Sequence, residues 1–156
     1  MKIFALFLGG MSLLSAGAAK ADCVDPLASS ASDVESQYRV EVCKLVNQNR
    51  VAAKAVALTL DLNLSKMAQD YARDMFQRNY FSHIDPDGHD FAYRLKQYKI
   101  KYSYAGENIA YGYTTPAEVM KGWMNSSGHK KNILNTKFRK LGVGYYQNYW
   151  VQEFTN

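Results

Sequence analysis

The sequence has few of the residues that form local metal or redox sites. Its 156 residues contain only two cysteines and three histidines, with no HExxH segment and no cluster of cysteine and histidine. Local zinc motifs depend on such closely spaced ligands. A metal site in this protein would therefore have to be assembled by the fold from residues that lie far apart in the chain.

Long apolar runs are also absent, except at the start. Lys2 precedes a mostly apolar stretch at 3–14, and the small residues around Ala21 suit a cleavage site. This pattern predicts a signal peptide at 1–21, with an uncleaved anchor as the alternative. A lipoprotein cut before Cys23 is disfavoured by the polar residues ahead of it. We expect a secreted mature chain, extracellular or periplasmic, with no transmembrane segment.

The charge excess is small. The net charge is +5, and loss of Lys2 and Lys20 with the signal peptide leaves +3 on the mature chain. An excess of this size is weak support for a polyanionic partner. The basic run "GHKKN" at 128–132 has no recognition helix beside it, so we predict no nucleic-acid partner.

The two cysteines, Cys23 and Cys43, suggest a disulfide if the chain matures in an oxidising compartment. Such a bond would tie the mature N-terminus to the first helix. Two unpaired thiols are the alternative.

Apolar spacing predicts four helices. The strongest stripe runs from Leu64 to Phe76 with a period close to 3.6. The predicted helices are at 34–49, at 64–79, at 91–98, and from Pro116 onward with Thr115 as the N-cap.

Extended structure is predicted later in the chain. Residues 102–112 form one extended run, and 141–154 form a hairpin that turns near Gln147 and Asn148. The segment 83–90, and the segment between the helix that begins at Pro116 and the hairpin, are expected to be loops. Helices followed by clustered strands indicate an α+β fold, an antiparallel sheet covered by helices.

Several polar residues are candidates for a functional site. They are His83, Asp85 and Asp87 in one segment, Glu107 in "GENIAYG", His129 in "SSGHKKN", and Gln152 and Glu153 near the C-terminus. Histidine titrates near neutral pH and is the commonest metal ligand. His83 and His129 with one carboxylate, Glu107 or Asp87, could hold zinc or another divalent ion with a bound water. The alternative is a hydrogen-bonded His–Glu pair without metal.

Short motifs occur in a defined order from residue 38 to residue 154. They are NxxR (Asn47–Arg50), LxxxAxxxA (Leu64–Ala72), FSHxxPDG (Phe81–Gly88), GENIAxG (Gly106–Gly112), WxxSxGHxxNIL (Trp123–Leu134), GVG (Gly142–Gly144) and WxQxF (Trp150–Phe154). In this order they resemble the CAP superfamily, which comprises cysteine-rich secretory, antigen 5 and pathogenesis-related class-one proteins, and in particular its bacterial SCP-like branch.

The resemblance implies a three-layer α-β-α sandwich with a small central antiparallel sheet, the domain covering 38–154 after a lead-in at 22–37. It also implies a cleft lined by two histidines and two acidic residues, which binds divalent metal in some members. No general enzymatic activity is implied. Lipid binding, proteolysis and cell-wall roles are attributed to individual members.

The family's cleft residues transfer to this chain one by one. Glu107 matches the central glutamate and His83 the first histidine, and Asp87 is preferred to Asp85 as the second acid. In the eukaryotic branch the second histidine falls on the position of Tyr149, whereas the bacterial branch offers His129. Ser82, Asn108, Ser126, Tyr149 and Gln152 are expected to support this cleft, with the serines capping or bracing loops.

Three functions fit these features. The first is a secreted, non-catalytic binding module whose His/acidic cleft takes a divalent metal or a small ligand. The second is a metal-assisted hydrolase, directed at peptides or the cell wall, with Glu107 as general base. The third is a lipid- or glycan-binding surface, because tyrosines crowd the second half of the chain and suit such surfaces.

Overall fold

The computed structural model describes residues 23–30 and 33–156, so the predicted signal peptide at 1–21 lies outside it. The elements are α1 (Val34–Ala52), β1 (Thr59–Leu60), α2 (Leu62–Gln77), α3 (Phe91–Gln97), β2 (Ala105–Tyr111), α4 (Pro116–Asn125), α5 (Ser127–Ile133), β3 (Lys140–Tyr146) and β4 (Tyr149–Thr155). None of the helices in the described part is both long and apolar enough to span a membrane.

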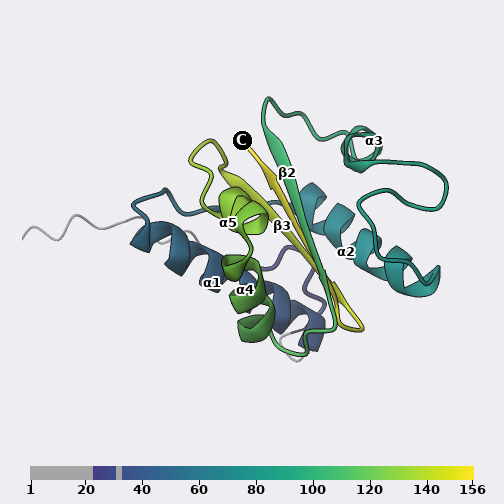
Figure 1. Cartoon of the computed structure of the whole chain (residues 1–156), viewed down its shortest axis with the longest axis horizontal. Helices are drawn as coiled ribbons and strands as arrows, with labels where there is room; N and C mark the ends of the chain where they lie inside the picture. Colours follow the sequence, from purple (N-terminus) through teal and green to yellow (C-terminus); the bar gives the residue numbers. More distant parts are fainter. Residues whose placement is uncertain (1–22, 31–32) are drawn as a thin grey trace, which may run out of the picture.

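The elements form three layers (Figure 1), with α2 and α3 on one face of the sheet and α1, α4 and α5 on the other. The strand order is β1-β3-β4-β2, and β4 pairs antiparallel with both β2 and β3. The α+β sandwich expected from the sequence is thus confirmed. The expected sheet was wholly antiparallel, but the two-residue β1 adds a parallel pair with β3.

Side-chain caps set where the helices begin. The Asp61 carboxylate accepts hydrogen bonds from the backbone of Asn63 and Leu64 at 3.0 and 3.1 Å, so α2 begins two residues before the predicted start. Thr115 and Glu118 form a capping box with Pro116 at the first position of α4, as the sequence indicates.

One helix was not expected. The segment that follows α4, predicted to be a loop, contains the seven-residue helix α5. Its glycine and lysines give no clear apolar stripe, so the periodic pattern that marks longer helices is missing. Buried Ile133 and the contacts of Asn132 with β2 hold this short helix against the sheet. His129 therefore lies on a helix.

The predicted hairpin turn is confirmed. Gln147 and Asn148 join β3 to β4 with φ of 46° and 64°. Two consecutive left-handed residues are typical of a two-residue turn whose twist matches that of the flanking strands. Tyr146 and Tyr149 pair across the turn, and this register fixes which residues of β4 face each side of the sheet.

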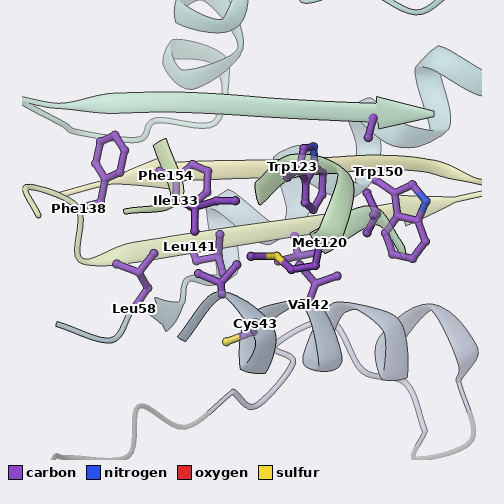
Figure 2. Packing of buried hydrophobic residues seen from close by; sticks show 14 residues of the cluster. Val42, Cys43, Leu58, Met120, Trp123, Ile133, Phe138, Leu141, Trp150 and Phe154 are labelled. Atoms are coloured by element: carbon purple, nitrogen blue, oxygen red, sulfur yellow. The ribbon is translucent and has the colours of Figure 1, made fainter. Parts of the chain in front are cut away.

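Alternation along β2 and β4 divides the sheet into two faces. Ile109, Tyr149 and Val151 pack with α2, whereas Trp150 and Phe154 join the larger core under α1, α4 and α5. Figure 2 shows Val42 and Cys43 of α1 and Trp123 of α4 meeting strand residues in that larger core. Glu107 and Glu153 share the α2 face, since they alternate with Ile109 and Val151.

Two glycines of β3 allow α2 to lie very close to the sheet. A Cβ on Gly144 would lie 2.1 Å from the backbone oxygen of Ala68, and one on Gly142 would lie 2.3 Å from the backbone of Leu64. Both distances are far below van der Waals contact. The "GVG" motif therefore sets the distance between α2 and the sheet, and with it the position of the site residues that α2 carries.

Arg50 of the NxxR motif has a structural role. It is fully buried and donates hydrogen bonds to the carbonyls of Val56, Ile133, Asn135 and Phe138. Burial, with a smaller contribution from Arg139, lowers its pKa to about 10. Arg50 thus joins the end of α1 to the segment after α5, and its carbonyl partners satisfy a charge that would otherwise be costly to bury.

The predicted disulfide is confirmed. Cys23 and Cys43 are bonded and are 20 positions apart in the sequence. The bond attaches the start of the described chain to α1, on the side of the sheet away from α2. A loop of this length is worth about 3 kcal/mol through the lost freedom of the unfolded chain.

Candidate functional site

Glu107 lies at the centre of a charged cluster on the α2 face of β2. Its side chain is nearly buried, and each carboxylate oxygen has a partner. His83 Nδ1 lies 2.7 Å from Oε1, and Arg94 Nη2 lies 2.6 Å from Oε2. We call His83, Arg94 and Glu107 the triad. The sequence suggested the contact between Glu107 and His83 but not the one with Arg94.

His83 is the exposed member of the triad. Its side chain is 56 % exposed, whereas that of Glu107 is 3 % exposed. Because an ionised carboxylate can only accept, Nδ1 must carry a hydrogen. In the neutral ring Nε2 is then an acceptor at the protein surface. Two backbone contacts hold the loop, from Tyr71 Oη to Ser82 O at 2.5 Å and from Arg94 Nη1 to His83 O at 3.2 Å.

Arg94 is held from several directions. It comes from α3, and its guanidinium lies 3.5 Å from the centre of the Tyr71 ring on α2. Burial lowers the pKa of Arg94, but the combined effect of Glu107, Tyr71 and Glu153 outweighs it, so the pKa is raised. The guanidinium is therefore a fixed positive charge beneath the exposed imidazole.

A second carboxyl group lies beside the triad. Glu153 of β4 is directly opposite Glu107 in the strand register and is fully buried. Among the described residues neither oxygen of Glu153 has a donor. Burial and the negative charge of Glu107 raise the pKa of Glu153 well above its usual range. In its protonated form Glu153 is neutral, so no second negative charge is buried beside Glu107.

His129 lies on α5, across the edge strand β2 from the triad. Burial and the nearby charge of His83 lower the pKa of His129, so the two rings are within electrostatic range. Within the described part of the chain, however, no hydrogen bond joins the His129 ring to the triad. The backbone oxygen of His129 is instead held by Asn108 Nδ2 at 3.2 Å.

Buried amides connect α5 to the sheet. Asn108 Nδ2 donates to Gln152 Oε1 at 3.0 Å, and Asn132 Nδ2 donates to Asn108 Oδ1 at 2.9 Å. Asn132 Nδ2 also lies 3.2 Å from the backbone oxygen of Glu107. This amide network, formed by Asn108, Asn132 and Gln152, fixes the part of β2 that carries Glu107.

The structure places Asp87 away from the triad. It is exposed and pairs with Arg78 at 2.8 Å. Asp85 folds its own loop, because Oδ1 accepts from the backbone of Asp87 and His89 at 2.9 Å and Oδ2 lies 3.1 Å from His89 Nδ1. Asp85, Asp87 and His89 form the one group of three potential metal ligands found among the described residues.

The triad does not fit a metal ion in this geometry. Both oxygens of Glu107 are engaged, one by His83 and one by a permanently charged guanidinium that would repel a divalent cation. His83 and His129 with Glu107 or Asp87 do not form a compact ligand group in the part of the chain that the structure describes. Metal binding by that set stays a prediction, without support from the geometry.

The other predicted supporting residues have structural positions. Ser82 Oγ accepts from the backbone of Ile84 at 3.1 Å, and Ser126 separates α4 from α5. Tyr149, at the position of the eukaryotic second histidine, packs its ring 4.4 Å from that of Tyr111. It contributes an aromatic ring where that branch has a titratable group.

Aromatic side chains continue from the triad along the surface. Phe81, two residues before His83, lies 6.3 Å from Tyr111 between ring centres, and they are 49 % and 56 % exposed. Tyr149 underlies both rings. We call Phe81, Tyr111 and Tyr149 the aromatic group. It places an apolar surface next to the polar triad.

Sequence analysis missed two site residues, Arg94 and Tyr71. Nothing in the local sequence of α3 or α2 marks them, because their role depends on how these helices cross. Glu153 was noted in its motif but was not assigned to the site. The signal that could have found Glu153 is the pairing of β2 with the hairpin, because this register places Glu153 directly opposite Glu107.

The cysteine-rich secretory protein (CAP) family matches the chain over residues 43–154. The chain is 43 % identical over 127 residues to the uncharacterized protein YkwD of Bacillus subtilis. The matched region covers 80 % of this chain and 49 % of YkwD. It thus spans about half the length of that relative.

Solved structures agree with this relationship. An extracellular protein of Bacillus anthracis that contains an SCP domain superposes with a TM-score of 0.77 at 34 % identity, covering 79 % of this chain and 41 % of that one. An outer surface protein of Borrelia burgdorferi shares the fold, with a TM-score of 0.68 at 23 % identity over 74 % of this chain and 89 % of that one. The chain belongs to the cysteine-rich secretory protein (CAP) family.

Proposed function

We propose that this CAP domain acts outside the cytoplasm as a binding module for a small ligand, without catalysis. The single observation that carries this proposal is the triad. A buried carboxylate and guanidinium orient an exposed imidazole through a 2.7 Å contact. Such preorganisation lowers the entropy cost of binding.

The surroundings of the triad narrow the chemistry of the ligand. With Nδ1 held by Glu107, the neutral tautomer of His83 presents an acceptor at Nε2, and a ligand bound to this atom would need a hydrogen-bond donor. Phe81 and Tyr111 offer exposed rings beside it, and rings of this kind suit the flat apolar face of a sugar or a lipid chain. We therefore expect a ligand with a hydroxyl or amine next to an apolar face, such as a cell-wall glycan fragment.

Action outside the cytoplasm is supported by two observations. The Cys23–Cys43 disulfide persists in oxidising compartments. Related structures are described as extracellular and as outer surface proteins. The predicted cut near Ala21 would release the mature chain there.

The test is a ligand screen by thermal shift with cell-wall glycan fragments and lipids, followed by calorimetry on the hits. His83→Ala should weaken binding of a true ligand about tenfold, the effect of one hydrogen bond to a charged or polarised group. His89→Ala is the matched control, a histidine in the same loop outside the triad. Equal binding by wild type and His83→Ala would refute the proposal. Zinc is titrated in parallel, and binding that His83→Ala and His129→Ala abolish would restore the metal hypothesis.

Hydrolysis is the second candidate, and a specific observation favours it. Glu107 holds His83 as a carboxylate holds the imidazole in acid–base dyads, so His83 Nε2 could take a proton from water. This mechanism makes His83 the general base, whereas the hydrolase expected from the sequence uses Glu107. Turnover of peptides or peptidoglycan that is lost in both His83→Ala and Glu107→Gln would establish it, and inactivity across those substrates would reject it.

A further inference from the structure

The end of the sheet where β2 begins carries a cavity of about 200 Å³, away from the triad. Its lining residues come from the start of α2, the segment after α3, and the ends of β3 and β4. They are Asp61, Asn63, Lys99, Ile100, Lys101, Lys140 and Thr155. In the strand register Lys140 and Ala105 both pair with Thr155, so these segments meet at one end of the sheet.

Positive charge dominates this cavity. Its three lysines face one acid, Asp61, which pairs with Lys140 at 3.2 Å and also caps α2. Among the described residues, Lys99 and Lys101 have no carboxylate partner. Ile100 packs on the core formed by α2 and α3, so the segment between these two lysines is anchored. The side chains around the cavity thus carry a net charge of about +2, which attracts anions.

A buried hydroxyl on the same face has no partner. Thr155 is fully buried, and its Oγ1 has no hydrogen-bond partner among the described residues. Alternation with Val151 and Glu153 puts the Thr155 side chain on the α2 face, where the cavity lies. Buried polar groups in folded proteins are rarely left unpaired. An oxygen atom of a bound anion would supply an acceptor for this hydroxyl.

The part of the chain that supplies most of the cavity is also rich in positive charge. Residues 94–156 contain ten Lys or Arg and only three Asp or Glu. Residues 22–93 contain seven Lys or Arg and eleven Asp or Glu. Lys137 and Arg139 lie just before Lys140, and Lys137 Nζ lies 3.9 Å from the centre of the exposed Tyr104 ring. These cations extend the positive field around the cavity and would draw anions toward it.

We propose that this cavity is a binding site for a phosphate group, held by Lys99, Lys101 and Lys140 with Thr155 at its base. Three ammonium groups and a hydroxyl match the several acceptor oxygens of a phosphate better than the two of a carboxylate. The phosphate belongs either to a free phosphate compound or to a phospholipid headgroup. The site is independent of the triad.

The first test is calorimetric titration of the purified protein with inorganic phosphate and with glycerol phosphate at low ionic strength. The variant Lys99→Asn/Lys101→Gln/Lys140→Gln should bind phosphate about tenfold more weakly or worse. Asn is chosen at position 99 because Lys99 has φ of 55°, which Asn tolerates. The control Lys44→Gln/Arg73→Gln/Lys121→Gln removes the same charge elsewhere and should bind as wild type does. Equal loss in both triple variants, or no phosphate binding by wild type, would overturn the proposal.

The variant Thr155→Val tests whether the phosphate contacts the Thr155 hydroxyl or is attracted only by the surrounding lysines. The two side chains have nearly the same shape, and circular dichroism checks that the fold is kept. We expect binding to weaken about threefold to tenfold, since the hydroxyl bonds a charged group. Unchanged affinity would show that Thr155 is not part of the site and would overturn the assignment.

Vesicles distinguish the two sources of phosphate. If the group belongs to a headgroup, the protein should sediment with phosphatidylglycerol vesicles, phosphate should compete, and vesicles of phosphatidylcholine alone should not bind. If it belongs to a free compound, phosphate titrates while phosphatidylglycerol vesicles do not bind. Binding of vesicles that the lysine variant leaves intact would contradict the proposed site.

Discussion

Two polar pairs lie side by side in the same strand register and are stabilised in different ways. Glu107 pairs with Glu153 on the α2 face, and Asn108 pairs with Gln152 on the opposite face. The acidic pair needs a guanidinium and a raised pKa to be buried. The amide pair is neutral and bonds directly to its neighbours and to α5.

The difference separates a charged face from a face held by neutral amides. On the α2 face, the charged groups lie close together, and the ring of His83 is the exposed member of the cluster. On the α5 face, the amides bond to one another and hold the strand in place, although Gln152 Nε2 has no partner among the described residues. Because burying a charge costs more than burying an amide, we expect the α2 face to respond most strongly to mutation and to pH.

The largest effect should come from Arg94→Leu. It leaves two buried carboxyl groups without their cation, and removing one partner of a buried pair typically costs about 3–5 kcal/mol. Denaturant unfolding at neutral pH measures this loss. Lys96→Leu, an exposed lysine on the same helix, should change stability far less. Similar values for the two variants would mean that the triad is not a stabilising charge cluster.

Asn108→Ala should weaken the opposite face by about 2–3 kcal/mol. The change leaves the oxygen of His129 and the amide of Gln152 without their partner, and each unpaired buried group costs about 1–3 kcal/mol. The free energy of unfolding is compared with that of Asn125→Ala, which removes an exposed amide from α4. A loss as large as that of Arg94→Leu would contradict the ranking of the two faces.

Glu153→Gln should stabilise the protein by about 1–2 kcal/mol at neutral pH. An unfolded glutamate loses its proton near pH 4.3, but burial and Glu107 raise the pKa of folded Glu153. The folded state therefore binds this proton more tightly, and stability falls as the pH rises from the unfolded pKa toward the folded one.

The gain from Glu153→Gln should accordingly vanish near pH 4 and grow above it. Unfolding is measured across this range, with Glu41→Gln on the surface of α1 as the control. A gain that does not depend on pH would mean that Glu153 is ionised in the folded protein.

The smallest effect tests electrostatic contact between the two faces. Burial and the charge of His83 lower the pKa of His129, so His83→Ala should raise the pKa of His129 toward its usual value without restoring it. Both rings are partly exposed, so solvent screens their interaction and the change in the pKa should be small. NMR titration of the ring protons measures it, and His89→Ala serves as control. An unaltered pKa would show that His129 is electrically separate from the triad.

Local sequence anticipated much of the fold, for physical reasons that act over a few residues. The α2 stripe, the capping box at Thr115 and the turn at Gln147 and Asn148 depend on neighbours in the chain. The short α5 was missed because its stability comes from packing on β2. Glu107 and His83 were found because their motifs are distinctive, whereas Arg94 carries no such local signal.

The sequence by itself determined the family and the order of most helices and strands, and it marked His83 and Glu107 as candidate site residues, since periodicity, caps and motifs are properties of short segments. Only the tertiary structure decided their partners. The packing of α3 gave Glu107 a guanidinium partner, and strand register placed Glu153 opposite it. Such contacts join residues 13 to 46 positions apart, and they form only when burial of the apolar core brings those segments together.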